Sequence, residues 1–528
     1  MIYRRRWIWI LTSLSAGLAV ALVIIAAAVP LSSDALRRRI VAELSQRMNA
    51  DIELGDLDLH LFPRLRASGG ALRVRQHGDG DEPLISVSHF VLDADLLGVV
   101  RHRIAHVQLV GLKIVIPPKN KSRDASDAVA TTGDRPQTDP SFEGDVVVDT
   151  LESTDAQLVI MPDREDQQKG KKPSIWAIHR LKMRDVGARS AMPFDATLTN
   201  AIPPGDIVTS GTFGPWKVEV PGDTPLAGQY VFDHADLNVF RGIGGTLSSR
   251  GTFGGALDYI DVNGETDTPD FVIDVGGHPF PMHTKFHTIV DGTNGNTYLK
   301  EIDVDFLKSS FVARGAVYDE GEHIPGRMVT LDIDMRHARI EDVMQMAVKA
   351  SPPPMVGALT LQTRFELPPG DADVADRLRL DGRFTIAGAR FTNMDVQAKI
   401  DELSQKSRGR TVLEQRNRVL SNFQGRFTLG AGKLKLGSLM FEVPGARVTL
   451  AGGYALKSEA LDFRGLMLMD AKVSDTQSGF KRLLLKVVDP LFRRKDGKDG
   501  SAVPFKINGK RSDPQFGLDF GRVFKRGN

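Results

Sequence analysis

Residues 433–443 read KLKLGSLMFEV, and this stretch decides the fold class. Apolar residues alternate in it with polar or small ones, and a period of two places successive side chains on opposite faces of a strand. A Pro-Gly turn follows, and the alternation then resumes. The stretch therefore predicts paired strands with one apolar face. Its apolar positions are Leu434, Leu436, Leu439, Phe441, Val443, Val448 and Leu450.

The same rhythm begins much earlier in the chain. Residues 56–61 read DLDLHL, so Leu57, Leu59 and Leu61 share one face of a predicted strand. Similar segments separated by short Gly, Asn or Asp turns continue from residue 51 towards the C-terminus. We expect a mostly β protein with a long meandering antiparallel sheet. The few breaks are a short helix over 338–350 and a polar helix or loop over 401–420.

The N-terminus carries a hydrophobic segment. No charge occurs from Trp7 to Val29, and at about 1.5 Å per residue a helix of this length crosses a hydrocarbon core of roughly 30 Å. We expect a single membrane anchor. A cleaved signal peptide is the alternative, because Ala26-Ala27-Ala28 resembles a cleavage site. The candidate anchor residues are Trp7, Trp9, Leu14, Leu18, Leu22 and Ile25.

Basic triplets flank this segment. Arg4 to Arg6 precede it and Arg37 to Arg39 follow it, so the distribution of positive charge leaves the orientation nearly balanced. A long following domain can be translocated regardless of charge, which favours a cytoplasmic N-terminus with the bulk of the chain outside.

The predicted organisation has four parts. An anchor over 1–30 precedes an amphipathic helix over 31–50, which lies against the membrane, closes the end of a sheet or packs as an ordinary helix. A β region over 51–400 contains a flexible insertion at 117–140, and a C-terminal region covers 401–528. Flexible composition also marks 163–174 and 493–501. Residues 479–492 are predicted as an amphipathic helix that caps the sheet, plugs a groove or touches a membrane.

Composition excludes several classes of function. The formal net charge is +2, from 68 basic and 66 acidic residues, so no field over the whole chain attracts nucleic acid. The chain has no cysteine, which removes disulfides, thiolate catalysis and cysteine-based metal sites.

Catalytic signatures are absent from the sequence. It has no phosphate-binding P-loop, no nucleophile elbow and no H-E-x-x-H motif. His278, His283 and His287 cluster in sequence, but along a strand the last two lie about 13 Å apart, too far to share a metal ion. The paired carboxylates Asp303/Asp305 and Asp332/Asp334 match solvated strand positions. We expect no enzyme activity, no cofactor and no metal site.

A loose Gly-x-Phe repeat runs through the β region. It recurs at Gly211, Gly251, Gly382 and Gly425, with a Gly-Tyr variant at Gly453. The spacing is irregular, so the repeat indicates one structural unit used several times or a coincidence in a chain with 51 glycines.

The order of these parts resembles the AsmA-like family. The resemblance rests at one end on an anchor, a helix and then residues 49–63, NADIELGDLDLHLFP. At the other end it rests on residues 439–446, 461–465, 503–509 and 513–519. Together these segments cover about a third of the chain.

The resemblance implies a single-pass inner-membrane protein of a Gram-negative envelope, with its bulk in the periplasm. It implies a curved β-sheet forming an elongated hydrophobic groove, related to TamB-type bridges, and a role in phospholipid transport and outer-membrane integrity. The expected partners are phospholipid, the inner membrane and a distal outer-membrane or periplasmic protein. The alternative is a non-catalytic scaffold for assembling outer-membrane proteins, whose apolar face is fully buried.

Overall fold

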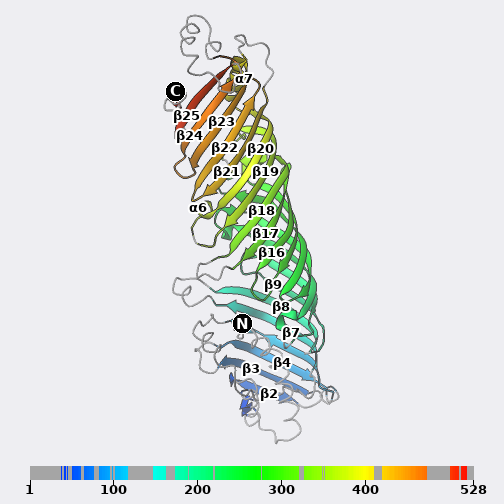
Figure 1. The fold of residues 1–528 in the computed structure, drawn as a ribbon. Helices are drawn as coiled ribbons and strands as arrows, with labels where there is room; N and C mark the ends of the chain where they lie inside the picture. Colours follow the sequence, from blue (N-terminus) through cyan, green and yellow to red (C-terminus); the bar gives the residue numbers. More distant parts are fainter. Residues whose placement is uncertain are drawn as a thin grey trace, which may run out of the picture. The chain divides into compact units, whose positions relative to one another are not determined.

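We describe the fold from a computed structural model of the full chain (Figure 1). Placement is described for residues 37–38, 41–42, 45, 50–60, 65–76, 83–95, 98, 101–116, 147–161, 173–187, 189–217, 220–274, 276–319, 326–347, 349, 351–370, 372–408, 419–472, 500–510 and 513–519. Among these described residues, strands make up 69% and helices 9%, so the prediction of a mostly β fold is confirmed.

The chain forms two compact units. The first comprises residues 1–236, 247–264 and 290–294, and the second comprises 237–246, 265–289 and 295–528. Strand β14 (Tyr259–Ile273) contributes its first part to unit 1 and its second part to unit 2. The predicted boundary at residue 400 falls inside a helix of unit 2.

Unit 1 is built from strands that pair mainly with their neighbours in sequence. Both β1 and β2 pair with β3, and β7 to β11 form an antiparallel ladder. The elements are β1 (Ala50–Glu53), β2 (Asp56–His60), β3 (Leu65–Gln76), β4 (Ile85–Ala94), β5 (Arg103–Val110), β6 (Lys113–Ile116), β7 (Val147–Ile160), β8 (Ser174–Val186), β9 (Met192–Thr199), β10 (Asp206–Phe213), η1 (Pro221–Asp223), β11 (Pro225–Asp236) and β13 (Thr246–Ala256).

The sheet of unit 1 is mixed, which corrects the expectation of antiparallel strands throughout. Strand β7 pairs in parallel with β5 and with β6. A parallel neighbour needs a long connection because the chain must return to the same end of the sheet. Residues 117–146, between β6 and β7, supply that length. Local alternation could not reveal this pairing.

Unit 2 continues as an antiparallel ladder in which each strand from β16 to β26 pairs with the next. Figure 1 shows these strands side by side, from green to red. The elements are η2 (Leu237–Val239), β12 (Ile243–Gly244), β15 (Phe280–Val290), β16 (Thr297–Phe306), β17 (Ser309–Tyr318), β18 (Met328–Arg339), β19 (Met355–Leu367), β20 (Arg379–Phe391), β21 (Ser421–Gly430), β22 (Lys433–Val443), β23 (Ala446–Ala455), β24 (Ala460–Met469), β25 (Ser501–Lys510) and β26 (Asp513–Leu518).

Three labelled helices belong to unit 2: α5 (Ile340–Ala347), α6 (Val374–Arg377) and α7 (Met394–Ser407). The helix expected over 338–350 is present but begins at Ile340, because β18 extends to Arg339. Helix α7 begins seven residues before the expected 401–420 segment. Asn393 caps it, since its Oδ1 accepts a hydrogen bond from Val396 N at 3.1 Å.

Several expected segments lie outside the described residues. These are the Trp7–Val29 anchor with all its candidate residues, the insertion at 117–140, the helix over 479–492 and most of 163–174 and 493–501. Within the helix expected over 31–50, the described positions 37–38, 41–42 and 45 are helical. Among the helices that the structure describes, none has the length and hydrophobicity needed to cross a membrane.

Candidate functional site

One face of strands β21–β25 is formed by apolar side chains. The register places Phe423 opposite Phe441, Phe441 opposite Val448 and Val448 opposite Met467. Directly opposed residues of a ladder point to the same face of the sheet, so this row crosses four strands. We define the apolar face as Phe423, Phe427, Leu434, Leu436, Leu439, Phe441, Val448, Leu450, Leu461, Phe463, Met467, Val503, Phe505 and Ile507.

The apolar face is half-buried rather than covered. Along β21, β22 and β23 most positions alternate between exposed and half-buried, and the half-buried ones carry the apolar side chains. Phe463 is more enclosed, at 7% exposure. Among the described residues, β21–β25 make extensive contacts only with their ladder neighbours, and α7 contacts β23. A contiguous apolar surface left partly open is the usual mark of an interaction site.

Aromatic rings lie over glycines on this face. Gly382 of β20 faces Phe427 of β21, and Gly425 of β21 faces Phe384 of β20. A Cβ atom built on Gly382 would lie 2.9 Å from the Phe427 ring. The ring of Phe505 covers Gly465 in the same way. The Gly-x-Phe repeat thus has a structural role in β20 and β21, because each glycine leaves room for a phenylalanine ring from the other strand of the pair.

The side chains of β15–β20 in unit 2 form a hydrophobic cluster that is closed to solvent. Phe280, Phe306 and Met335 are at most 6% exposed and belong to one hydrophobic cluster. Val343 and Met346 of α5 pack against that cluster. Aromatic rings link it along the sheet, with centroids 5.5 Å apart for Phe271–Phe280, 6.1 Å for Phe280–Phe306 and 6.0 Å for Phe306–Phe311.

Helix α5 is fixed to the sheet by buried carboxylate contacts. Asp342 is 6% exposed, and its Oδ2 accepts hydrogen bonds from Ser309 Oγ at 2.6 Å and from Lys308 N at 3.1 Å. Glu341 Oε2 accepts a further bond from Gly357 N at 3.1 Å. These bonds connect α5 to the β16–β17 turn and to β19, so the helix holds the closed cluster in place.

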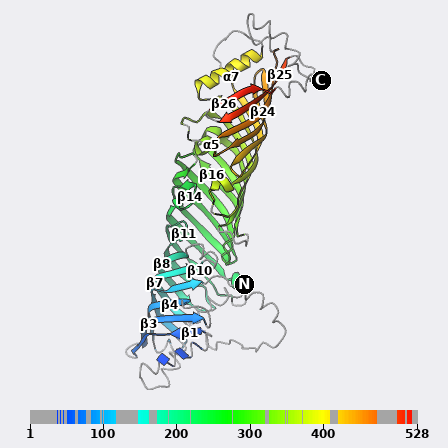
Figure 2. The same cartoon turned by 90° about the vertical axis from the view of Figure 1, so that its left-hand side faces the viewer.

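Helix α7 contacts β20 and β23, at the end of the ladder that Figure 2 shows uppermost. Gln397 is 3% exposed, accepts a bond from Phe391 N at 2.9 Å and donates to Val419 O at 3.1 Å. Ser404 Oγ donates to Pro444 O at 2.6 Å, in the β22–β23 turn. The apolar face is therefore bounded at this end by a helix held through polar contacts.

The predicted groove residues fall into two groups. At the C-terminal end, Leu434, Leu436, Leu439, Phe441, Val448 and Leu450 are half-buried and share the apolar face, whereas Val443 is 6% exposed at the end of β22. At the N-terminal end, Leu57 is 6% exposed inside the core of unit 1 and Leu59 packs against that core. Leu61 lies outside the described residues. The first group lies in unit 2 and the second lies in unit 1.

Sequence reasoning did not single out Leu461, Phe463, Phe505 and Ile507 as groove residues, although the register brings them to the apolar face. The signal was present, because 461–467 and 503–507 also alternate. Residues 470–500 separate β24 from β25, so pairing between these strands could not be inferred from a short turn.

Nothing in the described residues suggests metal binding. No group of three or more His, Asp or Glu side chains in them is placed to hold an ion. His283 Nδ1 lies 2.7 Å from Asp267 Oδ1, which accounts for this histidine as a hydrogen-bonded surface residue. Asp303, Asp305 and Asp332 are exposed.

Charged side chains on the strands of both units form ion pairs at the surface. Asp334 of β18 receives a hydrogen bond from Arg336 Nε at 2.9 Å, which holds the pKa of Asp334 below its usual range. In unit 1, Lys182 Nζ lies 2.9 Å from Glu152 Oε1 across the β7–β8 ladder and lowers the pKa of Glu152 through this hydrogen bond. Both carboxylates remain charged at neutral pH, as partners in surface pairs rather than as proton donors.

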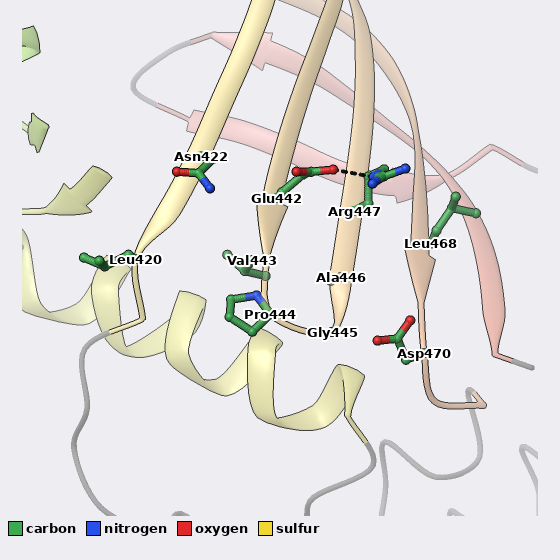
Figure 3. A pocket seen from close by; sticks show the side chains of 10 residues that line it. All are labelled: Leu420, Asn422, Glu442, Val443, Pro444, Gly445, Ala446, Arg447, Leu468 and Asp470. Atoms are coloured by element: carbon green, nitrogen blue, oxygen red, sulfur yellow. Dashed lines mark hydrogen bonds and ion pairs between the residues drawn. The ribbon is translucent and has the colours of Figure 1, made fainter. Parts of the chain in front are cut away.

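A surface hollow of about 480 Å³ lies beside the β22–β23 turn (Figure 3). Three charged residues line it: Glu442, Arg447 and Asp470. Glu442 and Arg447 bond to each other, so this pair offers no uncompensated charge. The lining residues are Leu420, Asn422, Glu442, Val443, Pro444, Gly445, Ala446, Arg447, Leu468 and Asp470. The apolar face is the stronger candidate for function because it extends over five strands and is chemically uniform.

Comparison with known proteins gives no assignment. No family model matches this chain, and no curated protein or solved structure shows a significant match to it.

Proposed function

We propose that this protein binds phospholipid acyl chains on the apolar face of β21–β25 and has no catalytic role. The observation that carries the proposal is the half-exposed state of an apolar surface continuous over five strands. A surface that needed only to complete a core would be covered, as the β15–β20 cluster is under α5.

The energetics favour an acyl chain as the occupant. Each CH₂ group removed from water contributes about 0.8 kcal/mol, so a lipid tail binds without any specific polar contact. Strands β21–β23 contain 10 or 11 residues each. At about 3.3 Å per residue they are longer than the roughly 15 Å depth of one bilayer leaflet's hydrocarbon. An acyl chain fits along or across these strands.

Bulges support a curved, groove-like form of this sheet. The register shifts between Met335 and Ala338, between Ile386 and Ala389, and between Leu436 and Leu439. A bulge bends its strand and increases the local twist. In the groove that we propose, the sheet curves towards the apolar face, so that the tails of a lipid are sheltered while the headgroup stays at the edge in water.

The sequence resemblance gives the cellular setting of the proposal. On this resemblance we propose that the protein is AsmA-like and is held in the inner membrane through Trp7–Val29, with its bulk in the periplasm. The function we propose is support of phospholipid transport towards the outer membrane.

The test is the lipid content of the full chain purified in mild detergent. Extracted phospholipid is quantified per protein by mass spectrometry. We expect bound phospholipid in the wild type, and a loss of most of it in Val448→Asp and Leu450→Asp, which place a charge on the apolar face.

Thr449→Asp and Ala451→Asp are the matched controls, because they introduce the same charge into β23 on the opposite face. They should retain the lipid. A lipid-free wild type would contradict the proposal and favour a scaffold. Equal lipid in all four variants would contradict the assignment of the face.

A further inference from the structure

The polar face of β20–β25 carries an excess of positive charge. We define the basic stripe as Arg383, Arg426, Lys435, Arg464, Lys506 and Lys510, all exposed. The register places these six side chains on one face, opposite to the apolar face. On the same face of the same strands, Asp381 and Asp462 are the exposed acidic residues.

The stripe includes like charges directly opposed across ladders. Arg383 faces Arg426, and Arg464 faces Lys506. Like charges directly opposed across a ladder destabilise the sheet, so local stability does not explain these pairs. Arg383 is bonded to the neutral oxygen of Gln362 at 2.8 Å. None of the ion pairs between described residues includes a member of the stripe.

The width of the basic stripe matches an extended anionic surface. The six strands from β20 to β25 span roughly 24 Å at about 4.8 Å per strand. This exceeds the Debye length of about 8 Å at physiological salt, so the stripe does not act on one small anion. It presents separate charges to a broad negative surface.

The neighbouring side chains favour a lipid surface over other polyanions. Met440, Leu466 and Leu468 are half-buried on the same face, beside the stripe. Apolar side chains next to basic ones are typical of peripheral membrane contacts. The residues opposite Arg426, Lys435 and Arg464 are Ser438, Gly453 and Ala451, so no aromatic ring there could stack on a nucleic-acid base.

We propose that the basic stripe docks the polar face of β20–β25 onto the headgroups of a bilayer containing anionic phospholipid. Fluid headgroups can move to match the spacing of the six charges, whereas an acidic protein would have to match it with a fixed surface. This docking does not depend on lipid binding by the apolar face.

The test uses the full chain reconstituted in neutral phosphatidylcholine nanodiscs, which are mixed with separate vesicles. We expect capture by vesicles of phosphatidylcholine and phosphatidylglycerol at 4:1 and little capture by pure phosphatidylcholine vesicles. Each basic residue near an anionic membrane contributes about a threefold to fivefold gain in binding. The triple variant Arg426→Gln, Arg464→Gln, Lys506→Gln should therefore bind at least tenfold more weakly.

The matched control is Lys285→Gln, Lys300→Gln, Lys308→Gln, which removes the same charge from exposed positions elsewhere in unit 2. It should retain capture. Because the stripe variant removes like-charge repulsion, its thermal midpoint should not fall. Equal capture by neutral vesicles, or unchanged capture of the stripe variant, would overturn the proposal. Retention on an acidic protein matrix without capture by anionic vesicles would also overturn it.

Discussion

Phe384 of β20 covers Gly425 of β21, and the neighbouring pair repeats the arrangement in reverse with Phe427 and Gly382. The two rings lie 6.1 Å apart between centroids. Each ring spreads over a glycine instead of standing beside a second large side chain.

Replacing Gly425 by valine should destabilise the sheet. A Cβ atom there would lie 3.0 Å from both the Phe384 ring and the Ser438 backbone oxygen, so the ring or the strand must shift. Overpacking of this kind costs about 1–3 kcal/mol, measured as a lower thermal midpoint. Gly437→Ala is the control, because no atom lies within 4 Å of its added Cβ. An unchanged midpoint for Gly425→Val would show that the ring does not rest there.

Helix α5 should loosen when its buried carboxylate is neutralised. Asp342→Asn removes the negative charge from the group that accepts bonds from Ser309 Oγ and Lys308 N, so neither bond is assisted by charge any longer. A buried donor left without its charged partner costs about 1–3 kcal/mol. Hydrogen exchange should accelerate in residues 340–347, whereas the exposed Asp332→Asn should leave it unchanged. Unaltered exchange in α5 would mean that apolar packing alone holds the helix.

The Glu152–Lys182 pair should contribute to stability only when the carboxylate is charged. The hydrogen bond from Lys182 lowers the pKa of Glu152 in the folded state, so the contribution is present above the ordinary glutamate pKa and disappears as the pH falls through the lowered value. Both side chains are partly exposed, and such pairs contribute about 0.2–1 kcal/mol.

Lys182→Met should therefore lower the thermal midpoint at pH 6, and the difference from wild type should shrink towards pH 3. Lys285→Met, at an exposed position in β15, controls for the loss of one positive charge. A difference that persists unchanged at low pH would assign the effect to lost packing of the lysine stem.

The alternation of apolar and polar residues along the sequence predicted the strands. It also predicted which residues of a strand share its apolar face. The residues 433–443 are an example, since β22 has these bounds. It could not predict how open each apolar face is: Leu57 and Leu436 occupy similar patterns, yet Leu57 is buried in a core and Leu436 is half-exposed. Burial depends on what covers a strand, and α5 and the parallel β5–β7 pairing are long-range features.

The sequence did contain a local signal for the start of α7. Asn393 precedes Met394 and Asp395, a common beginning for a helix. The expected segment was placed too far towards the C-terminus because the residues after 401 are rich in charge. The side chains that attach α7 to the sheet are Gln397 and Ser404.

Photo-crosslinking along β23 in cells tests the central claim most directly. A photoreactive residue is placed singly at Val448 or Leu450 on the apolar face, and at Thr449 or Ala451 on the polar face. We predict adducts to phospholipid acyl chains from the first two positions. The other two positions face headgroups in the docking proposed above, so their adducts should form with headgroups and only rarely with acyl chains. Acyl-chain adducts of equal yield on both faces, or none at Val448 and Leu450, would contradict acyl-chain binding by this face.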